Sequence, residues 1–278
     1  MEIAYDKKTL ISLLNKNSSS VRGLIPTMGN LHKGHLDLVY RSTLDCAYTV
    51  VTIFVNPLQF GPNEDFHKYP RTIEEDIGIL KESNVDLVFA PSIKEMYGED
   101  KAEQVIVAVT RLSEILCGKN RPGHFDGVTT VVAKLLNLIS PTYAYFGQKD
   151  WQQLALVKTM VEQLDMRTKI IGIKTTREKD GLAISSRNQY LTKEERSIAP
   201  LLKAELDNIS IRLRNGETDY GVVETESKSN LSRVGFDVDY IAIRDSHRLC
   251  TPDEETKSLR ILAAAYLGRT RLIDNIGF

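Results

Sequence analysis

Short runs of apolar, often β-branched residues alternate with longer stretches of helical spacing through most of the chain. Most of these runs are nearly continuous, which is typical of strands buried on both faces of a parallel sheet. They predict strands at residues 21–25, 48–55, 85–89, 104–109, 143–146 and 169–174.

The helical stretches between these runs are clearer. From Val128 to Ile139, apolar residues follow i, i+3, i+4, i+7 spacing, and Pro141 lies just beyond the end. A second helix is expected after Asp150 and a third over residues 73–82. Strands that alternate with helices predict an α/β protein with a Rossmann-like, doubly wound parallel sheet.

The pattern changes after about Arg187. A charged helical stretch over residues 192–214 ends at Gly216, and another helix is expected near 220–233. Strand patterns follow at 238–244, 259–266 and 270–276, the last two separated by a short turn around Gly268. We therefore expect a first domain over residues 1–180 and a smaller C-terminal α+β domain with an antiparallel sheet over 181–278.

Composition and charge narrow the class of protein. The 278 residues include 36 Lys+Arg and 37 Asp+Glu, which leaves no broad cationic field for nucleic acid or an anionic membrane. The three cysteines, Cys46, Cys117 and Cys250, form neither a disulfide framework nor a metal-binding pair, as in proteins of a reducing compartment. Without an apolar run of membrane-spanning length or a visible export signal, a cytoplasmic protein is expected.

The most informative segment is residues 26–35, Pro-Thr-Met-Gly-Asn-Leu-His-Lys-Gly-His, between the first expected strand and a helix beginning near Leu36. The free N–H groups and the dipole of a helix N-terminus attract anions. His32 and His35 can donate to phosphate oxygens and stabilise charge that builds up in a transition state. The alternative is that both histidines merely cap the helix, but two histidines around a glycine at this turn favour a phosphate site.

Further informative segments lie at residues 54–61, 69–72, 121–128, 146–153 and 177–188. Segments 54–61 and 146–153 follow strands, and ligands bind at the carboxyl edge of open α/β sheets. Each also has an ordinary reading. The first can be a Pro/Gly turn with a buried amide, Asp150 and Gln153 a capping box, Lys149 a solvated side chain and 177–188 an interdomain loop.

The His-x-Gly-His segment resembles the HIGH signature of the nucleotidyltransferase superfamily, whose members attack the α-phosphate of ATP. Taken together, the segments from Pro26 to about Leu191 closely resemble the pantothenate synthetase family of pantoate–β-alanine ligases, in the same order and spacing. The resemblance implies that pantoate is activated by ATP as an enzyme-bound pantoyl adenylate, with release of pyrophosphate. The amine of β-alanine then attacks the acyl carbon to give pantothenate and AMP.

The resemblance also implies roles for individual residues. His35, in the family's proton-donor position, His32 and Lys149 are expected to be catalytic. Gln59 and Gln153 match the pantoate-binding glutamines, and Asn56, Tyr69 and Arg121 are expected to line the same pantoate and β-alanine cleft. The expected ATP-binding residues are Met28, Gly29, Asn30, Leu31, His32, Lys33, Gly34, His35, Gly147, Gln148, Lys149, Asp150, Thr176, Ile184, Ser185, Ser186 and Arg187.

Mg²⁺ is expected with ATP, but its ligands cannot be read from the sequence. Glu75 and Asp76 are candidates, against the alternative that they are solvated helix acids. The family resemblance further implies a homodimer, and a C-terminal domain that closes over the site to protect the adenylate from water.

The chain departs from the family pattern at three positions: Cys117 and Gln148 stand where Glu is usual, and Gly98 where Pro is frequent. A cytidylyltransferase of the same superfamily and a non-catalytic nucleotide-binding sensor are the main alternative functions. The first shares only the His-x-Gly-His segment, and the second needs neither both histidines nor Lys149. A tRNA-binding role lacks the basic patch or the appended domain that it would require.

Overall fold

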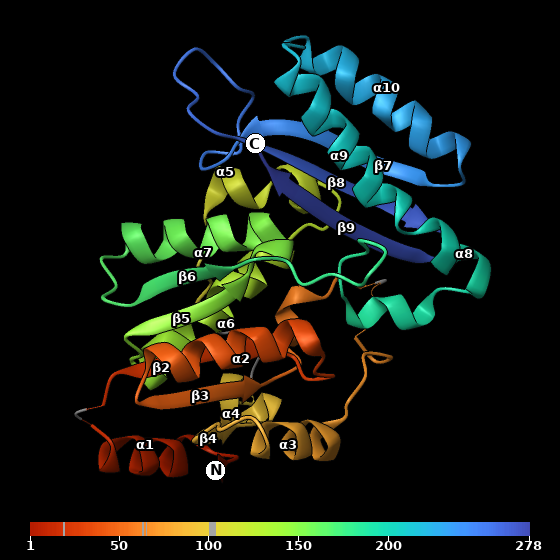
Figure 1. The fold of residues 1–278 in the computed structure, drawn as a ribbon. Helices are drawn as coiled ribbons and strands as arrows, with labels where there is room; N and C mark the ends of the chain where they lie inside the picture. The colour runs from red at the N-terminus through yellow and green to blue at the C-terminus, as the bar shows by residue number, and fades with distance from the viewer. Residues whose placement is uncertain (19, 63, 65, 100–103) are drawn as a thin grey trace. The chain divides into compact units, whose positions relative to one another are not determined.

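The computed structural model describes residues 1–278 except 19, 63, 65 and 100–103 (Figure 1). The chain divides into two compact units. The N-terminal unit comprises Met1–Gln148 and Gln153–Lys174, and the C-terminal unit comprises Lys149–Gln152 and Thr175–Phe278. A parallel sheet in the first unit and an antiparallel sheet in the second confirm the predicted fold class. The sequence pattern does not predict that residues 149–152 belong to the C-terminal unit.

The sheet of the N-terminal unit has the order β1-β4-β3-β2-β5-β6, and its paired strands run parallel. The chain places β3 and β4 on one side of β2 and then adds β5 on the other. Ligands of open α/β sheets bind outside the carboxyl ends of the strands at such a reversal. The strands are β1 (Glu2–Ala4), β2 (Arg22–Thr27), β3 (Tyr48–Ile53), β4 (Leu87–Phe89), β5 (Tyr143–Gly147) and β6 (Lys169–Ile173).

Helices connect these strands, and helix α6 (His124–Ile139) is buried over most of its surface. Helix α6 packs closely on the turn η1, where a side chain at Gly127 would meet the Leu58 carbonyl oxygen at 2.2 Å. The helices of this region are α1 (Lys7–Lys16), α2 (Lys33–Asp45), α3 (Ile73–Lys81), α4 (Ile93–Tyr97), α5 (Thr110–Ser113), α6 (His124–Ile139) and α7 (Trp151–Gln163). The 3₁₀ turns are η1 (Pro57–Gln59), η2 (Leu116–Gly118) and η3 (Gln148–Asp150).

One predicted strand is absent from both sheets, and one observed strand was not predicted. Residues 104–109 join neither sheet, and their backbone is bonded to threonines of α6 instead. The Val107 N–H donates to Thr130 Oγ1 at 2.9 Å, and the Thr129 hydroxyl donates to the Val107 carbonyl. A β-branched run is thus compatible with a segment whose hydrogen bonds come from side chains. Strand β1 was missed because three residues are too few to show a period.

The C-terminal unit packs its helices on an antiparallel sheet of order β7-β8-β9 (Figure 1). Its elements are η4 (Ser186–Tyr190), α8 (Lys193–Ile198), α9 (Leu201–Arg214), α10 (Tyr220–Arg233), β7 (Asp237–Asp245), β8 (Leu259–Leu267) and β9 (Thr270–Gly277). The helix predicted over 192–214 is divided into α8 and α9. The break occurs at Pro200, the N-cap of α9, because proline lacks the N–H that a continuous helix would need there.

Candidate functional site

The His-x-Gly-His segment forms the turn between β2 and α2, as predicted. Gly29 and Asn30 both adopt left-handed conformations, with φ of 82° and 50°. The Thr27 hydroxyl accepts the Gly29 N–H at 3.2 Å and donates to the Thr52 carbonyl at 2.7 Å, so the turn is tied to the end of β3. Lys33 and Gly34 begin α2. Residues 28–35 therefore lie at the carboxyl edge of the sheet, beside the strand at which the order reverses.

Asp76 of α3 holds this turn in place. Its carboxylate accepts the N–H groups of Asn30 at 3.0 Å and Leu31 at 2.8 Å, and the Thr72 hydroxyl at 3.1 Å. Only 1% of Asp76 is exposed, so it is not a solvated helix acid, whereas Glu75 is exposed. The N–H groups of Asn30 and Leu31 are thus directed at a carboxylate of the protein, and the anion-binding donors must come from elsewhere in the turn.

The two histidines are coupled to each other. His35 Nδ1 accepts the backbone N–H of His32 at 3.3 Å, and the two rings stack with centroids 4.0 Å apart. Because Nδ1 accepts, the proton of the neutral His35 ring is on Nε2, which is then the donor atom. The capping role and the catalytic role are therefore compatible, since His35 caps α2 with one nitrogen and donates with the other.

Asn56 is buried behind the second predicted site segment and uses its whole amide inside the protein. Its oxygen accepts the Leu58 N–H at 3.2 Å and the Tyr97 hydroxyl at 2.7 Å. Burial raises the pKa of Tyr97, which stays protonated and donates. The Asn56 amide nitrogen donates to the Gly127 carbonyl at 3.0 Å and to Gln59 Oε1 at 3.1 Å. With four hydrogen bonds made, Asn56 holds the Gln59 side chain in place, and we call such a supporting residue a bracket.

This bracket fixes the direction of the Gln59 amide. Because Gln59 Oε1 accepts from Asn56, its Nε2 is the group that remains to donate, and it faces Met28 Sδ at 3.1 Å. A thioether is a weak acceptor, so a carboxylate or hydroxyl oxygen of a ligand would be a better partner for this N–H. Gln59 and the histidine-bearing turn are thus in direct contact through Met28.

Arg121 and Tyr69, also predicted to line the cleft, have partners in the protein. The Arg121 guanidinium binds the Glu64 carboxylate through Nε at 2.7 Å and Nη2 at 2.5 Å, and its Nη1 lies 2.9 Å from His124 Nε2. Since Arg121 can only donate, His124 accepts at Nε2 and donates from Nδ1 to the Gln59 carbonyl at 2.7 Å. Tyr69 is buried, with its ring edge against Phe60.

The remaining predicted residues of the N-terminal unit lie at or after the end of β5. Gly147 ends this strand, and Gln148 Nε2 donates to the Gly172 carbonyl at 3.3 Å. Gln153 is half-buried in the first turn of α7. Cys117, where the family usually has Glu, is buried in η2 and brings no carboxylate to this region.

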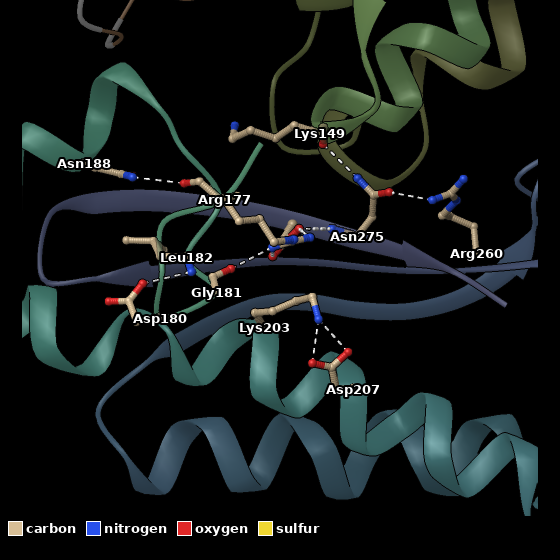
Figure 2. Close-up of polar contacts among 12 residues, drawn as sticks. Lys149, Arg177, Asp180, Gly181, Leu182, Asn188, Lys203, Asp207, Arg260 and Asn275 are labelled. Carbon is tan, nitrogen blue, oxygen red and sulfur yellow. Dashed lines mark hydrogen bonds and ion pairs between the residues drawn. The ribbon is translucent and has the colours of Figure 1, made fainter. Parts of the chain in front are cut away.

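In the C-terminal unit, the backbone of Lys149 is pinned by Asn275 of β9 (Figure 2). The Asn275 amide nitrogen donates to the Lys149 carbonyl at 2.8 Å, and its oxygen accepts from Arg260 Nη1 at 3.1 Å. Arg260 lies over the Trp151 ring at 3.3 Å from its centroid. Burial lowers the pKa of Arg260 to about 10, so it remains a cation at neutral pH. Asp150 follows Lys149 and ends η3.

The loop predicted to bind phosphates is also braced within the C-terminal unit (Figure 2). Arg177 makes a bidentate ion pair with Asp274, at 2.6 and 2.8 Å, and Ile184 N–H donates to the Thr176 carbonyl at 3.0 Å. Ser185 Oγ accepts the Arg187 N–H at 3.3 Å and caps η4, which begins at Ser186. These contacts shape a compact turn between the predicted Thr176 and Arg187 positions.

Three supporting residues were missed by the reasoning from sequence: Asn275, Asp274 and Tyr97. Asn275 and Asp274 are polar residues inside an otherwise strand-like run, and this break in the pattern was the available signal. Tyr97 gave no signal, because a buried aromatic residue near a helix end is ordinary core.

Comparison with known proteins is consistent over the whole chain. The family described as Pantoate-beta-alanine ligase matches residues 2–277. The pantothenate synthetases of Pseudomonas fluorescens and Alcanivorax borkumensis are 50% and 49% identical over 254 residues, covering 91% of this chain and 89% of each relative.

Solved structures agree. Pantothenate synthetase from Thermus thermophilus is 41% identical with a TM-score of 0.93, covering 99% of both chains. Pantoate-beta-alanine ligase from Francisella tularensis, solved in complex with beta-gamma ATP and beta-alanine, is 36% identical with a TM-score of 0.82, covering 99% of this chain and 97% of that one. The chain belongs to the pantoate–β-alanine ligase family.

Proposed function

We propose that this chain joins pantoate and β-alanine to form pantothenate, using ATP and passing through an enzyme-bound pantoyl adenylate. Family membership over residues 2–277 supports the overall reaction. The observation that carries the mechanism is the contact between Gln59 Nε2 and Met28 Sδ at 3.1 Å. This contact supports the proposal because the family resemblance matches Gln59 to pantoate and Met28 to ATP, and adenylation requires the carboxylate and the α-phosphate side by side.

In the first step, a pantoate carboxylate oxygen attacks the α-phosphorus, and the bond from this phosphorus to the bridging oxygen of pyrophosphate breaks. Negative charge builds up on the phosphate oxygens. His35 Nε2–H and the N-terminus of α2 are the donors of the N-terminal unit that we assign to this charge, and the family resemblance adds the Lys149 ammonium. His32 supports them by holding the His35 ring through its backbone N–H and by stacking on it.

In the second step, the free amine of β-alanine attacks the acyl carbon and AMP leaves with the bonding electron pair. Gln59 and Gln153 hold the pantoyl group during both steps. Gln59 serves as an N–H donor to pantoate oxygens because Asn56 occupies its carbonyl. Asn56 and Arg121 act through Gln59, since Asn56 donates to its side-chain oxygen and Arg121 binds His124, which donates to its backbone carbonyl.

The described residues do not form a metal site of their own. No group of three or more His, Cys, Asp or Glu side chains in this part of the chain is placed to hold an ion. The Asp76 carboxylate faces two backbone N–H groups, which a bound cation would displace. We therefore propose that Mg²⁺ arrives bound to the phosphates of ATP, and we assign it no protein ligand.

We also propose that the enzyme is a homodimer, as the family resemblance implies. Residues 104–109 support this assignment, because they have a strand-like sequence outside both sheets. Val105 is 81% exposed and Ile106 is 52% exposed. An extended apolar segment of this kind suits pairing with a second copy. Light scattering on the wild type and on Val105→Lys measures this directly: a monomeric wild type would contradict the proposal, and a dimer lost in the variant would support it.

No helix in the described part of the chain is long and apolar enough to cross a membrane. We place the reaction in the cytoplasm because it consumes ATP.

The experiment that tests the proposed function is pantoate-dependent exchange of labelled pyrophosphate into ATP, with Mg²⁺ and without β-alanine. Exchange is expected, because the adenylate forms reversibly before the amine is needed. Addition of β-alanine should then yield pantothenate and AMP. A folded, ATP-binding protein that catalyses neither exchange nor pantothenate formation would contradict the proposal. Pantothenate formation without exchange would leave the overall reaction intact and contradict reversible formation of the enzyme-bound adenylate.

A further inference from the structure

We infer that Asp76 is a positioning residue that sets the geometry of the histidine-bearing turn. The inference rests on the proposed function for its consequence in catalysis, but the contact itself does not depend on it. The Asp76 carboxylate reaches across 45 and 46 residues of sequence to accept the N–H groups of Leu31 and Asn30. These are the two residues immediately before His32, where α2 is capped.

The turn and the carboxylate fit each other closely. A side chain at Gly29 would lie 2.9 Å from Asp76 Oδ2 and 3.1 Å from Ile53 Cγ2. Gly29 also has a φ of 82°, a conformation that L side chains rarely adopt. Together with the left-handed Asn30, this conformation turns two successive N–H groups toward one carboxylate, as in other anion-binding backbone turns. The anion that occupies this turn is therefore supplied by the protein.

The buried charge of Asp76 is compensated locally. Besides the two N–H groups, its carboxylate accepts the Thr72 hydroxyl at 3.1 Å, and Asp76 lies in the first turn of α3, where a negative charge is favourable. This arrangement also gives Thr72, the last residue of the Tyr-Pro-Arg-Thr segment, a defined task. Thr72 thus orients the Asp76 carboxylate, and this carboxylate orients the turn at Asn30 and Leu31.

The consequence for catalysis is geometric. We call the contacts of Asp76 with the Asn30 and Leu31 N–H groups the clamp. Because His32 and the first turn of α2 follow these two residues directly, the clamp determines where the His35 ring and the helix N–H groups point. Misplacement of catalytic groups by about 1 Å can lower a rate by about 10²-fold. Gln59 is held by separate contacts to Asn56, so pantoate binding should be less affected than the adenylation rate.

The test is Asp76→Asn, which keeps the shape but replaces one acceptor oxygen by an N–H donor facing a backbone N–H. We expect kcat for pantoate-dependent pyrophosphate exchange to fall by about 10²-fold, with KM for pantoate changed by less than about threefold. The matched control is Asp86→Asn. Asp86 also accepts a backbone N–H, from Thr49 at 2.7 Å, but near the amino end of β3. It should lose thermal stability and retain kcat.

A second pair of variants covers a failure of Asp76→Asn to fold. Thr72→Val removes one donor and should lower kcat, and Thr72→Ser, which keeps the hydroxyl, should restore it. In addition, NMR of the substrate-free enzyme should show the Asn30 and Leu31 amides of Asp76→Asn, or of Thr72→Val, exchanging with solvent about tenfold faster. This exchange tests the clamp even if the wild type shows no adenylation. A folded Asp76→Asn enzyme with normal kcat and unchanged amide exchange would overturn the inference, as would equal kcat values in Thr72→Val and Thr72→Ser.

Discussion

Two buried asparagines, one in each unit, hold a residue of the proposed site in different ways. Asn56 binds the side-chain oxygen of Gln59, and Asn275 binds the main-chain oxygen of Lys149 (Figure 2). Both asparagines are almost completely buried, with 1% and 3% of their surface exposed. Each also has its oxygen bound by other protein groups, so neither amide can rotate without losing several hydrogen bonds.

The difference lies in what each bracket leaves movable. Gln59 is fixed to the end of its side chain, so its N–H is directed before substrate arrives. Lys149 is held through its backbone carbonyl, and no hydrogen bond or ion pair among the described residues holds its four-carbon side chain. A fixed amide suits recognition of one ligand geometry, whereas a mobile ammonium suits charge that shifts from ATP to pyrophosphate during the reaction. We therefore expect Gln59 to control the binding of pantoate and Lys149 to control the rate of adenylation.

The largest effect that this comparison predicts is on the rate of adenylation. Lys149→Ala should lower kcat for pyrophosphate exchange by about 10²–10³-fold, the scale for loss of one preorganised donor, and His35→Ala should do the same. KM for pantoate should change little in either variant. Melting temperature measured beside kinetics will separate loss of chemistry from loss of fold.

Lys203→Ala is the matched control for the lysine. Lys203 belongs to the same unit and pairs with Asp207 one helical turn away, a contact of small energetic value (Figure 2). Its removal should leave kcat unchanged. Near-normal turnover in folded Lys149→Ala would mean that other groups determine the adenylation rate. The proposed difference between Gln59, which controls binding, and Lys149, which controls rate, would then be wrong.

The next effect separates Gln59 from its own bracket. Gln59→Ala should raise KM for pantoate by about 10–150-fold, because one hydrogen bond to a charged group contributes about 1.5–3 kcal/mol. Asn56→Ala should instead lower the free energy of unfolding by about 2 kcal/mol or more. It leaves the Tyr97 hydroxyl and the Gly127 carbonyl without their buried partner, at about 1–3 kcal/mol for each group. Denaturant unfolding and steady-state kinetics on both variants measure the two quantities. Equal losses of stability would show that Gln59 is structural.

The fold was predictable to the extent that each element creates its own pattern. Helix α10 was placed at its observed bounds, Tyr220–Arg233, because its ends carry ordinary signals. The segment 104–109 was assigned to a sheet wrongly because local sequence does not show whether a neighbouring strand or the side chain of Thr130 supplies its hydrogen bonds. The grouping of residues 149–152 with β9 depends on contacts across more than 120 residues, which no local pattern contains.

The site divides in the same way. Motifs identified Gln59, His35 and Lys149, whose residue types and positions after strands suggest a ligand. They predicted Asn56 and Arg121 in the same cleft and did not distinguish them as residues that also bond to other protein groups. The distinction requires knowing which hydrogen bonds are already made inside the protein. Asp76 illustrates the point: the sequence offered it as a candidate metal ligand, and the structure shows that its carboxylate accepts three hydrogen bonds within the protein.

A smaller effect is expected from the second bracket. Asn275→Asp keeps the size of the side chain and an acceptor for Arg260, but loses the donor to the Lys149 carbonyl. Net loss of one hydrogen bond is about 0.5–1.5 kcal/mol, so kcat for adenylation should fall by about tenfold or less, with KM for pantoate unchanged. Single-turnover formation of the adenylate will measure it. A rise in KM for pantoate instead of a fall in kcat would mean that Asn275 acts on binding, as Asn56 does.

The smallest effect should come from the ion pair between Glu64 and Arg121, which is linked to Gln59 through His124. The two side chains are 23% and 19% exposed, and partly exposed pairs contribute about 0.2–1 kcal/mol. Glu64→Gln should therefore raise KM for pantoate by less than about fivefold, and the difference from the wild type should shrink at high salt. Glu99→Gln, in the exposed pair with Lys94, is the control without effect. If Glu64→Gln raised KM for pantoate as much as Gln59→Ala, Arg121 would have to contact the substrate itself. It would then be a substrate-binding residue and not a support of Gln59.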